Sequence, residues 1–195
     1  MSTTDEFWRL FIAIELPSNV RRTLKDHIDH LRDAIPDARA SWAREENLHL
    51  TLKFLGDMTL TSVERLSQAT QRAASAVAPF EMIIGTSGAF PPNGQPRVLW
   101  IGIEDPAGEL AVLHEVLEDQ CVQAGFAREN RPYHPHLTIA RLRQAQGARR
   151  LSQIHKEMGF DRESLAVTHL ALIRSELLRE GSRHTVVARH PFSPA

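Results

Sequence analysis

The sequence is poor in cysteine and has no long apolar run. Its single cysteine, Cys121, excludes an intramolecular disulfide and a cysteine-based metal cluster, which fits a reducing compartment. Near the N-terminus, acidic residues precede the apolar stretch RLFIAIEL, residues 9–16. That stretch is too short for a signal-peptide core or a membrane span. We therefore expect a cytoplasmic protein.

A large net charge of either sign is also missing. The formal net charge is −1 at pH 7, which predicts no global attraction to nucleic acid or to an anionic membrane. Lysine is scarce, since three lysines stand against 20 arginines. Arginine offers a planar fork that matches phosphate oxygens, although a GC-rich genome produces the same bias. Positive charge is in local excess in one segment, because residues 128–150 contain six arginines and one acid, Glu129.

The rest of the composition is that of an ordinary soluble globular protein, with 42% hydrophobic and 24% charged residues in a chain of 195. Such a length fits one domain or two closely packed halves. Residues 9–16 are typical of a buried strand. A helical stripe follows, with apolar residues at spacings of three and four: Val20, Leu24, Ile28 and Leu31.

Further along, helical and strand patterns alternate. Helices are expected at 61–77, after Pro106 and at 148–158, and strands at 48–55, 80–90, 97–104, 136–140, 165–177 and 184–190. The loop PPNGQP suits a hairpin between two of the strands. The two halves of the chain, which divide near residue 104, repeat helix, strand and hairpin in similar order. This indicates a weak internal duplication, with two helix-backed antiparallel sheets that face each other.

Two of the expected strands carry the same polar pair, a histidine followed two positions later by a threonine: His49 and Thr51, then His136 and Thr138. Side chains alternate in a strand, so each histidine shares a face with its threonine, and the first face also receives Lys53. An exposed sheet surface would explain one such pair, because threonine is β-branched. A second copy 87 residues later is harder to explain that way.

Phosphodiester hydrolysis gives a chemical reason for two histidines. One histidine activates water as a base, and the other protonates the departing oxygen as an acid, each worth roughly 10² to 10⁴-fold in rate. The threonine hydroxyls donate hydrogen bonds to the phosphate oxygens. No metal is then needed. The alternative is a metal site that uses His134 and His136, which stand two residues apart.

Residues near the two motifs supply further candidates for substrate binding. Phe54 and Tyr133 could stack on a base, with core packing as the alternative for Phe54. Arg131 and Arg141 belong to the arginine-rich segment, but Arg141 would face away from His136 unless the strand ends or bulges at Ala140. The histidines on expected helices are interpreted as surface residues: His27, His30, His114 and His155.

Together these residues resemble a known family, the two-histidine phosphoesterases, and within it the bacterial RNA 2′,3′-cyclic phosphodiesterases, also called 2′-5′ RNA ligases. Blocks in the order of that family cover nearly the whole chain: RLFIAIELP, NLHLTLKFLGD, GAFPPNGQPRVLWIGI, RPYHPHLTIAR and SELLREGSRHTVVAR. Two departures are His134, where many relatives have an aromatic residue or arginine, and His184, where tyrosine is frequent.

The resemblance implies an α+β fold: one bilobal domain over residues 1–195, with two antiparallel sheets and outer helices in a pseudo-twofold arrangement around a central cleft. It implies hydrolysis of RNA 2′,3′-cyclic phosphate ends to a 2′-phosphate, with His49 as proton donor and His136 as proton acceptor. Thr51 and Thr138 match the phosphate-binding threonines. It also implies 2′-5′ ligation without ATP as the reverse reaction.

We expect no cofactor, no membrane partner and a monomer. Rival hypotheses are an RNA-end binding module without turnover and a physiological substrate that is a small cyclic nucleotide.

Overall fold

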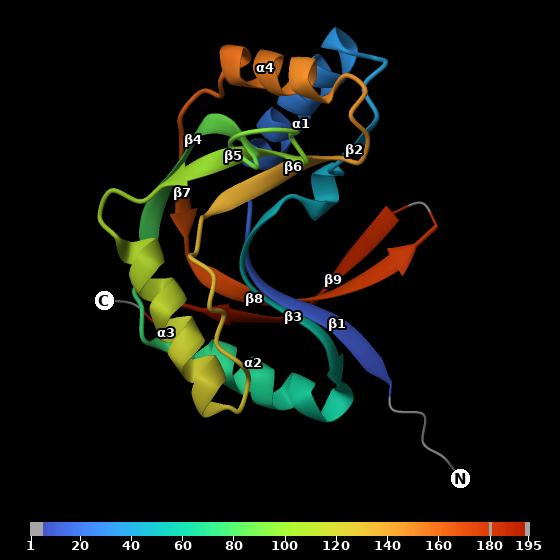
Figure 1. Ribbon diagram of the computed structural model, residues 1–195. Helices are drawn as coiled ribbons and strands as arrows, with labels where there is room; N and C mark the ends of the chain where they lie inside the picture. The colour runs from blue at the N-terminus through green and yellow to red at the C-terminus, as the bar shows by residue number, and fades with distance from the viewer. Residues whose placement is uncertain (1–5, 180, 194–195) are drawn as a thin grey trace.

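The computed structural model describes residues 6–179 and 181–193 as two antiparallel sheets that face each other, with helices on their outer sides (Figure 1). The first sheet has the strand order β3-β1-β8-β9, and the second has the order β2-β6-β5-β4-β7. The α+β class predicted from the sequence is thus confirmed, and so is the bilobal arrangement of antiparallel sheets.

The strands of the first sheet come from both ends of the chain. They are β1 (Phe7–Glu15), β3 (His49–Thr59), β8 (His169–Leu178) and β9 (Gly181–Pro191). The second sheet contains β2 (Ala40–Trp42), β4 (Phe80–Phe90), β5 (Val98–Glu104), β6 (His136–Leu142) and β7 (Glu163–Val167). A short 3-10 turn, η1 (Glu45–Asn47), connects β2 to β3.

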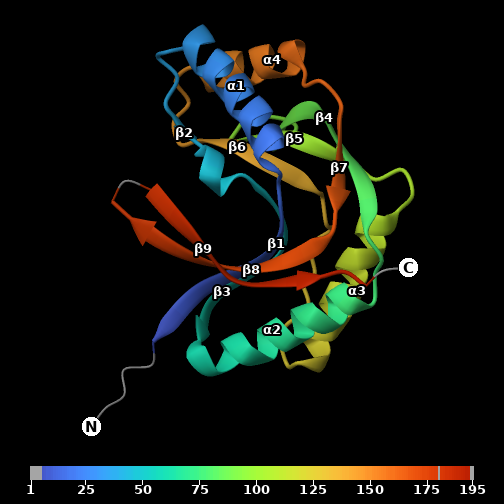
Figure 2. The same ribbon diagram turned by 180° about the vertical axis from the view of Figure 1, so that it is seen from behind.

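The helices form two pairs on opposite sides of the molecule (Figure 2). Helices α1 (Ser18–Ala34) and α4 (Ala148–Met158) lie outside the second sheet, and α2 (Leu60–Ser75) and α3 (Glu109–Gln123) lie outside the first. The expected stripe of α1 is buried, with Leu24 and Leu31 both fully covered. None of the described helices is long and apolar enough to cross a membrane.

The two halves of the sequence do not coincide with the two sheets, which corrects the expectation. The β4–β5 hairpin of the first half joins the sheet of β6, and the β8–β9 hairpin of the second half joins the sheet of β1 and β3. The chain therefore crosses between sheets repeatedly, and the halves exchange their hairpins. Each half does contribute one motif strand to a different sheet, as expected: β3 to the first sheet and β6 to the second.

The single strand expected over 165–177 is in fact two strands. Thr168 separates β7 from β8, which belong to different sheets, and its carbonyl accepts a hydrogen bond from Phe192 N at 2.9 Å. Strand β2 lies outside all the strands expected from the sequence. Periodicity does not reveal either feature, since the apolar pattern continues through Thr168, and three residues are too few to show alternation.

Candidate active site

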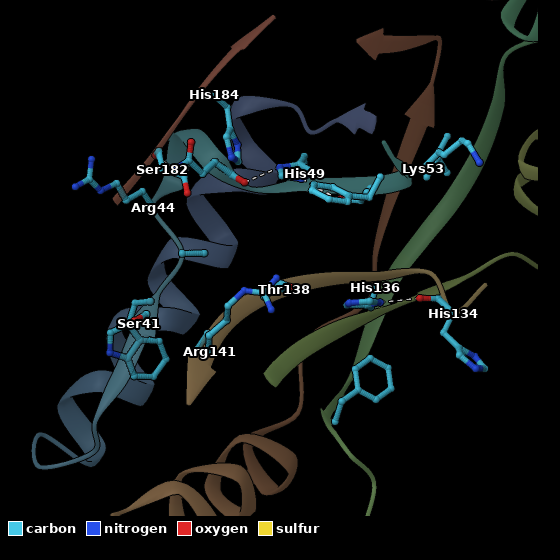
Figure 3. A pocket seen from close by; sticks show the side chains of 18 of the residues that line it. Ser41, Arg44, His49, Lys53, His134, His136, Thr138, Arg141, Ser182 and His184 are labelled. Carbon is cyan, nitrogen blue, oxygen red and sulfur yellow. Dashed lines mark hydrogen bonds between the residues drawn. The ribbon is translucent and has the colours of Figure 1, made fainter. Parts of the chain in front are cut away.

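The two motif strands face each other across one cavity of about 1150 Å³. His49 and Thr51 line it from β3, and His136 and Thr138 line it from β6. Figure 3 shows His49 and His136 on the two opposite strands. All eight residues singled out from the sequence line this cavity, the others being Phe54, Arg131, Tyr133 and Arg141. Strand alternation places Leu50 and Leu137 on the opposite faces, where both are fully buried.

Both motif strands bulge at the same place, four residues into each strand. Next to β1 the register skips Leu52, and next to β5 it skips Ile139. Burial therefore follows the same sequence in the two strands over their first six residues, and the sixth returns to the cavity. That residue is Phe54 in β3 and Arg141 in β6. Arg141 therefore lies on the same side of β6 as His136, as the sequence predicted for a strand that bulges at Ala140.

The bulge also corrects the placement of Lys53. Regular alternation puts Lys53 on the face of His49, but after the bulge its side chain turns away and is 3% exposed. Its Nζ donates to Glu118 Oε1 and Oε2 at 2.8 Å and to the carbonyl of Ala127 at 2.9 Å. Lys53 thus fastens β3 to α3 and to the segment that leads to β6.

The two histidines have matching orientations. His49 Nδ1 lies 2.7 Å from the carbonyl of Asn47, and His136 Nδ1 lies 2.7 Å from the carbonyl of His134. A carbonyl can only accept, so each Nδ1 carries the proton and donates it. In the neutral ring Nε2 is then a lone-pair acceptor, free for proton transfer. Thr51 Oγ1 lies 3.0 Å from His49 Nε2 and donates to it in this tautomer.

His49 is the more enclosed of the two rings. Phe11 stacks on it at 4.6 Å between ring centroids, and His184 meets it edge-on at 5.2 Å. Burial lowers the pKa of His49 to about 4, and the neighbouring His184 contributes in the same direction. His49 is therefore neutral at pH 7. His136 is less enclosed: the ring of Phe90 meets it edge-on, with 5.1 Å between the ring centroids.

Tyr133 and Arg131 have partners of their own at the edge of the cavity. The Tyr133 hydroxyl donates to the carbonyl of Thr51 at 3.3 Å, and its ring stacks on His114 at 4.0 Å. Burial raises the pKa of the Tyr133 hydroxyl. Arg131 is 82% exposed and binds Glu129 through Nε and Nη2. Tyr133 thus supports Thr51 from behind, whereas Arg131 lies at the rim.

The metal alternative lacks a third ligand in the part of the chain that the structure describes. Within the described residues no group of three or more histidine, cysteine, aspartate or glutamate side chains is placed to hold a metal ion. His134 is exposed, and the Nδ1 of His136 is engaged with a backbone carbonyl.

Comparisons with known proteins identify the family of the chain. The model of the 2′-5′ RNA ligase superfamily matches residues 20–178. The chain belongs to this superfamily. An "RNA 2′,3′-cyclic phosphodiesterase" of Methanothermobacter thermautotrophicus is 32% identical over 180 residues, which cover 91% of this chain and 95% of the relative.

Two solved structures are similar to this superfamily member over nearly the whole chain. TT0787 of Thermus thermophilus has a TM-score of 0.78 at 26% identity, and the match covers 95% of this chain and 98% of that one. The Escherichia coli LigT structure in complex with 3′-AMP has a TM-score of 0.73 at 29% identity, with coverage of 96% and 99%.

The superfamily member also has site residues that the sequence does not single out as functional. Phe11 stacks on His49 from the adjacent strand β1, and Phe90 meets His136 edge-on from β4, which lies two strands away in the same sheet. His184 lines the cavity from β9 and contacts His49. No spacing rule links them to the motifs. The arrangement depends on which strands become neighbours.

Three histidines expected at the surface are buried instead: His27, His114 and His155. His27 Nε2 lies 3.1 Å from His155 Nδ1, and His155 Nε2 donates to the carbonyl of Trp100 at 3.0 Å. The helical spacing indicates the burial of His27, since this residue follows Leu24 by three positions and precedes Leu31 by four on the buried stripe of α1. His30 is exposed as expected.

Proposed function

We propose that the protein hydrolyses the 2′,3′-cyclic phosphate at RNA ends to a 2′-phosphomonoester, with His49 and His136 as acid and base. The observation that carries the proposal is the pair of equally oriented histidines on opposite walls of one cavity, each with Nδ1 on a backbone carbonyl. The names of similar proteins support it: a cyclic phosphodiesterase acting on RNA, and LigT in complex with 3′-AMP.

In the proposed reaction, His136 Nε2 takes a proton from water, whose oxygen attacks the phosphorus in line with the P–O3′ bond. That bond breaks as the new P–O bond forms, and His49 Nε2 gives its proton to O3′. The products are a 2′-phosphate and a free 3′-hydroxyl. Thr51 and Thr138 hydroxyls donate to the non-bridging oxygens, where charge accumulates.

A proton must reach His49 before it can act as an acid, because its pKa of about 4 makes it neutral at pH 7. The bound phosphate supplies the cause, since a nearby negative charge favours the imidazolium. Protonation of Nε2 also removes the acceptor for Thr51 Oγ1, which now lies 3.0 Å away. The hydroxyl is then released to the phosphate.

The remaining candidates receive supporting roles. Arg141 contacts the substrate, since the bulge turns it into the cavity. Phe54 offers an open aromatic face to a base at the mouth, where it is 53% exposed. Tyr133 holds Thr51 in place, and Arg131 lies at the rim as a weaker contact to substrate.

We also propose that the chain acts as one bilobal domain and as a cytoplasmic monomer. Both walls of the cavity come from one chain, so no partner residue is needed to complete it. Cys121 is a free thiol in the core, compatible with a reducing compartment.

Ligation is the second reaction that the same residues support. If a 5′-hydroxyl replaces water as nucleophile, the product is a 2′-5′ phosphodiester, and the energy of the cyclic phosphate makes ATP unnecessary. The match to the 2′-5′ RNA ligase superfamily favours this as a side reaction.

Turnover of an oligonucleotide that ends in 2′,3′-cyclic phosphate, measured with excess chelator, tests the proposal. Phosphorus NMR of the product identifies which hydroxyl keeps the phosphate. A 2′-phosphate formed in chelator is expected. Binding without turnover would indicate an RNA-end binding module, and activity that needs added metal would favour the metal alternative.

A further inference from the structure

The cavity extends beyond the two histidines, and one end of it is rich in arginine. Its volume of about 1150 Å³ exceeds what a single small ligand usually fills. Arg44 and Arg141 line the end of the cavity that lies away from His134, which we call the arginine end (Figure 3). Arg143, two residues beyond Arg141, and Arg179, two residues before the Gly181 that contacts Arg44, line the same cavity and complete this end. Among the described residues that line the cavity, Glu129 is the one carboxylate, and it binds Arg131.

The arginine end is assembled from three separate stretches of chain. Strand β2 pairs with β6, so that Ser41 stands opposite Arg141, and Arg143 follows just beyond the end of β6. The Arg44 guanidinium packs beside Gly181, whose added Cβ would lie 3.6 Å from Arg44 Nη2. Asn47 Nδ2 donates to the carbonyl of Ser182 at 2.7 Å, which fastens the start of β9 to the segment after β2.

Three of the four arginines at this end lack protein counter-ions in the part of the chain that the structure describes. Within residues 6–179 and 181–193, no carboxylate forms an ion pair with Arg141, Arg143 or Arg179. Like charges gathered in a concave surface favour a ligand that brings several negative charges. Arginine forks match phosphate oxygens in geometry as well as in charge.

The spacing along β6 separates this end from the reacting phosphate. A strand rises about 3.3 Å per residue, so the backbone of Arg143 lies roughly 20 Å from that of His136. A cyclic mononucleotide carries one phosphate, which the histidines hold in the proposed function. It leaves the far arginines without a ligand.

We infer that the arginine end binds backbone phosphates of an RNA strand, on the 5′ side of the nucleotide that carries the cyclic phosphate. The inference rests on the proposed function and narrows its substrate class to oligonucleotides. The strand enters between β2 and the β8–β9 hairpin, and its 3′ end stops between His49 and His136.

The test compares four substrates that share the same terminal adenosine 2′,3′-cyclic phosphate: the nucleoside form, its 5′-phosphate, a dinucleotide and a tetranucleotide. Wild type, Arg143→Gln, Arg179→Gln and the double variant are assayed at several salt concentrations. Arg150→Gln is the matched control, since Arg150 is exposed on α4 and does not line the cavity. Binding of the same compounds in fluorescent form is followed by anisotropy.

Wild type is expected to show a kcat/KM that rises about three- to tenfold for each phosphate contacted by an arginine. In each variant, kcat/KM should rise less from the mononucleotide to the tetranucleotide than it does in wild type. The slope of log KM against log salt concentration should also fall by about 0.7 per arginine removed. A 5′-phosphate on the mononucleotide should recover part of the gain. The Arg150 control should match wild type in both respects.

A chain-length gain that is absent in wild type, or equal in wild type and the double variant, would overturn the inference while leaving the proposed function intact. If wild type turns over none of the substrates, the proposed function fails. The binding arm then still decides the inference: tighter binding of the tetranucleotide that the double variant loses supports it, and equal binding refutes it.

Discussion

Lys53 and Glu118 form an ion pair between β3 and α3, with Nζ 2.8 Å from Oε2 and side chains that are 3% and 2% exposed. Glu118 Oε2 also accepts from the backbone N of Glu129 at 3.1 Å, so the pair holds the segment before β6. Each motif strand is thereby tied to the other through one buried contact.

Removal of one member of this pair should be costly, because the other charge stays buried without a partner. We expect Lys53→Met to lower the free energy of unfolding by about 3–5 kcal/mol, and Lys53→Met with Glu118→Leu to recover much of the loss. Urea denaturation of the two single variants and the double variant measures this. A double variant whose loss of unfolding free energy equals the sum of the two single losses would contradict the pairing.

His184 should help to keep His49 neutral, although burial is the larger cause. His184→Phe keeps an aromatic ring beside His49 and removes the charge, so the pKa of His49 should rise. NMR titration of the His49 ring protons measures the shift, with His30→Gln on the exposed face of α1 as control. An unchanged titration of His49 in His184→Phe would show that the neighbouring imidazole has no influence.

Stability should fall as the pH is lowered from 6.5 to about 4. Burial lowers the pKa of both His27 and His49 to about 4 from the ordinary histidine value of 6.5, so in this window the unfolded chain binds protons that the folded chain excludes. Within this window each such histidine lowers the free energy of unfolding by roughly 1.4 kcal/mol for each pH unit of acidification. Urea midpoints at several pH values should show a flatter dependence for His27→Gln, and no change for His134→Gln, whose side chain is exposed. An equal slope in all three proteins would refute the assignment.

Phe54 should affect substrate binding much more than stability. Its ring is 53% exposed at the cavity, with Arg9 Cζ 4.8 Å from its centroid. Loss of stacking on one base costs about 1–3 kcal/mol, so Phe54→Ala should raise KM at least fivefold. Phe7→Ala is the control, because Phe7 is 58% exposed and does not line the cavity. Equal effects of the two variants would argue against a stacking role.

The motif faces could be predicted from the sequence because alternation in a strand is a local property. His49 and Thr51 share a face for that reason alone, and two copies of the pair indicated two walls. The direction of Lys53 could not be predicted, since the bulge at Leu52 depends on the register against β1. The exchange of hairpins between the sheets is likewise a long-range property.

Histidine burial was the part that the sequence could have revealed but the interpretation missed. His114 follows Leu110 by four residues on the stripe of α3, and His155 follows Leu151 by four on α4. Position on an apolar stripe therefore indicates the burial of these histidines better than the polarity of their side chains does. His184 differs, because its contact with His49 arises from β9 and β3 lying on the same sheet without being adjacent strands.

The central claim is the division of labour between His49 and His136, and a substrate with sulfur in place of the leaving O3′ tests it most directly. A thiolate departs without protonation, so the acid becomes dispensable while the base does not. Rates are measured in chelator for wild type, His49→Ala, His136→Ala and the control His134→Ala, with circular dichroism to verify folding.

On the oxygen substrate, His49→Ala and His136→Ala should each lose roughly 10² to 10⁴-fold in kcat, and His134→Ala should stay near wild type. On the sulfur substrate, His49→Ala should regain most of its activity and His136→Ala should not. Recovery by His136→Ala instead would exchange the two roles, and full activity of either variant on the oxygen substrate would contradict the two-histidine mechanism.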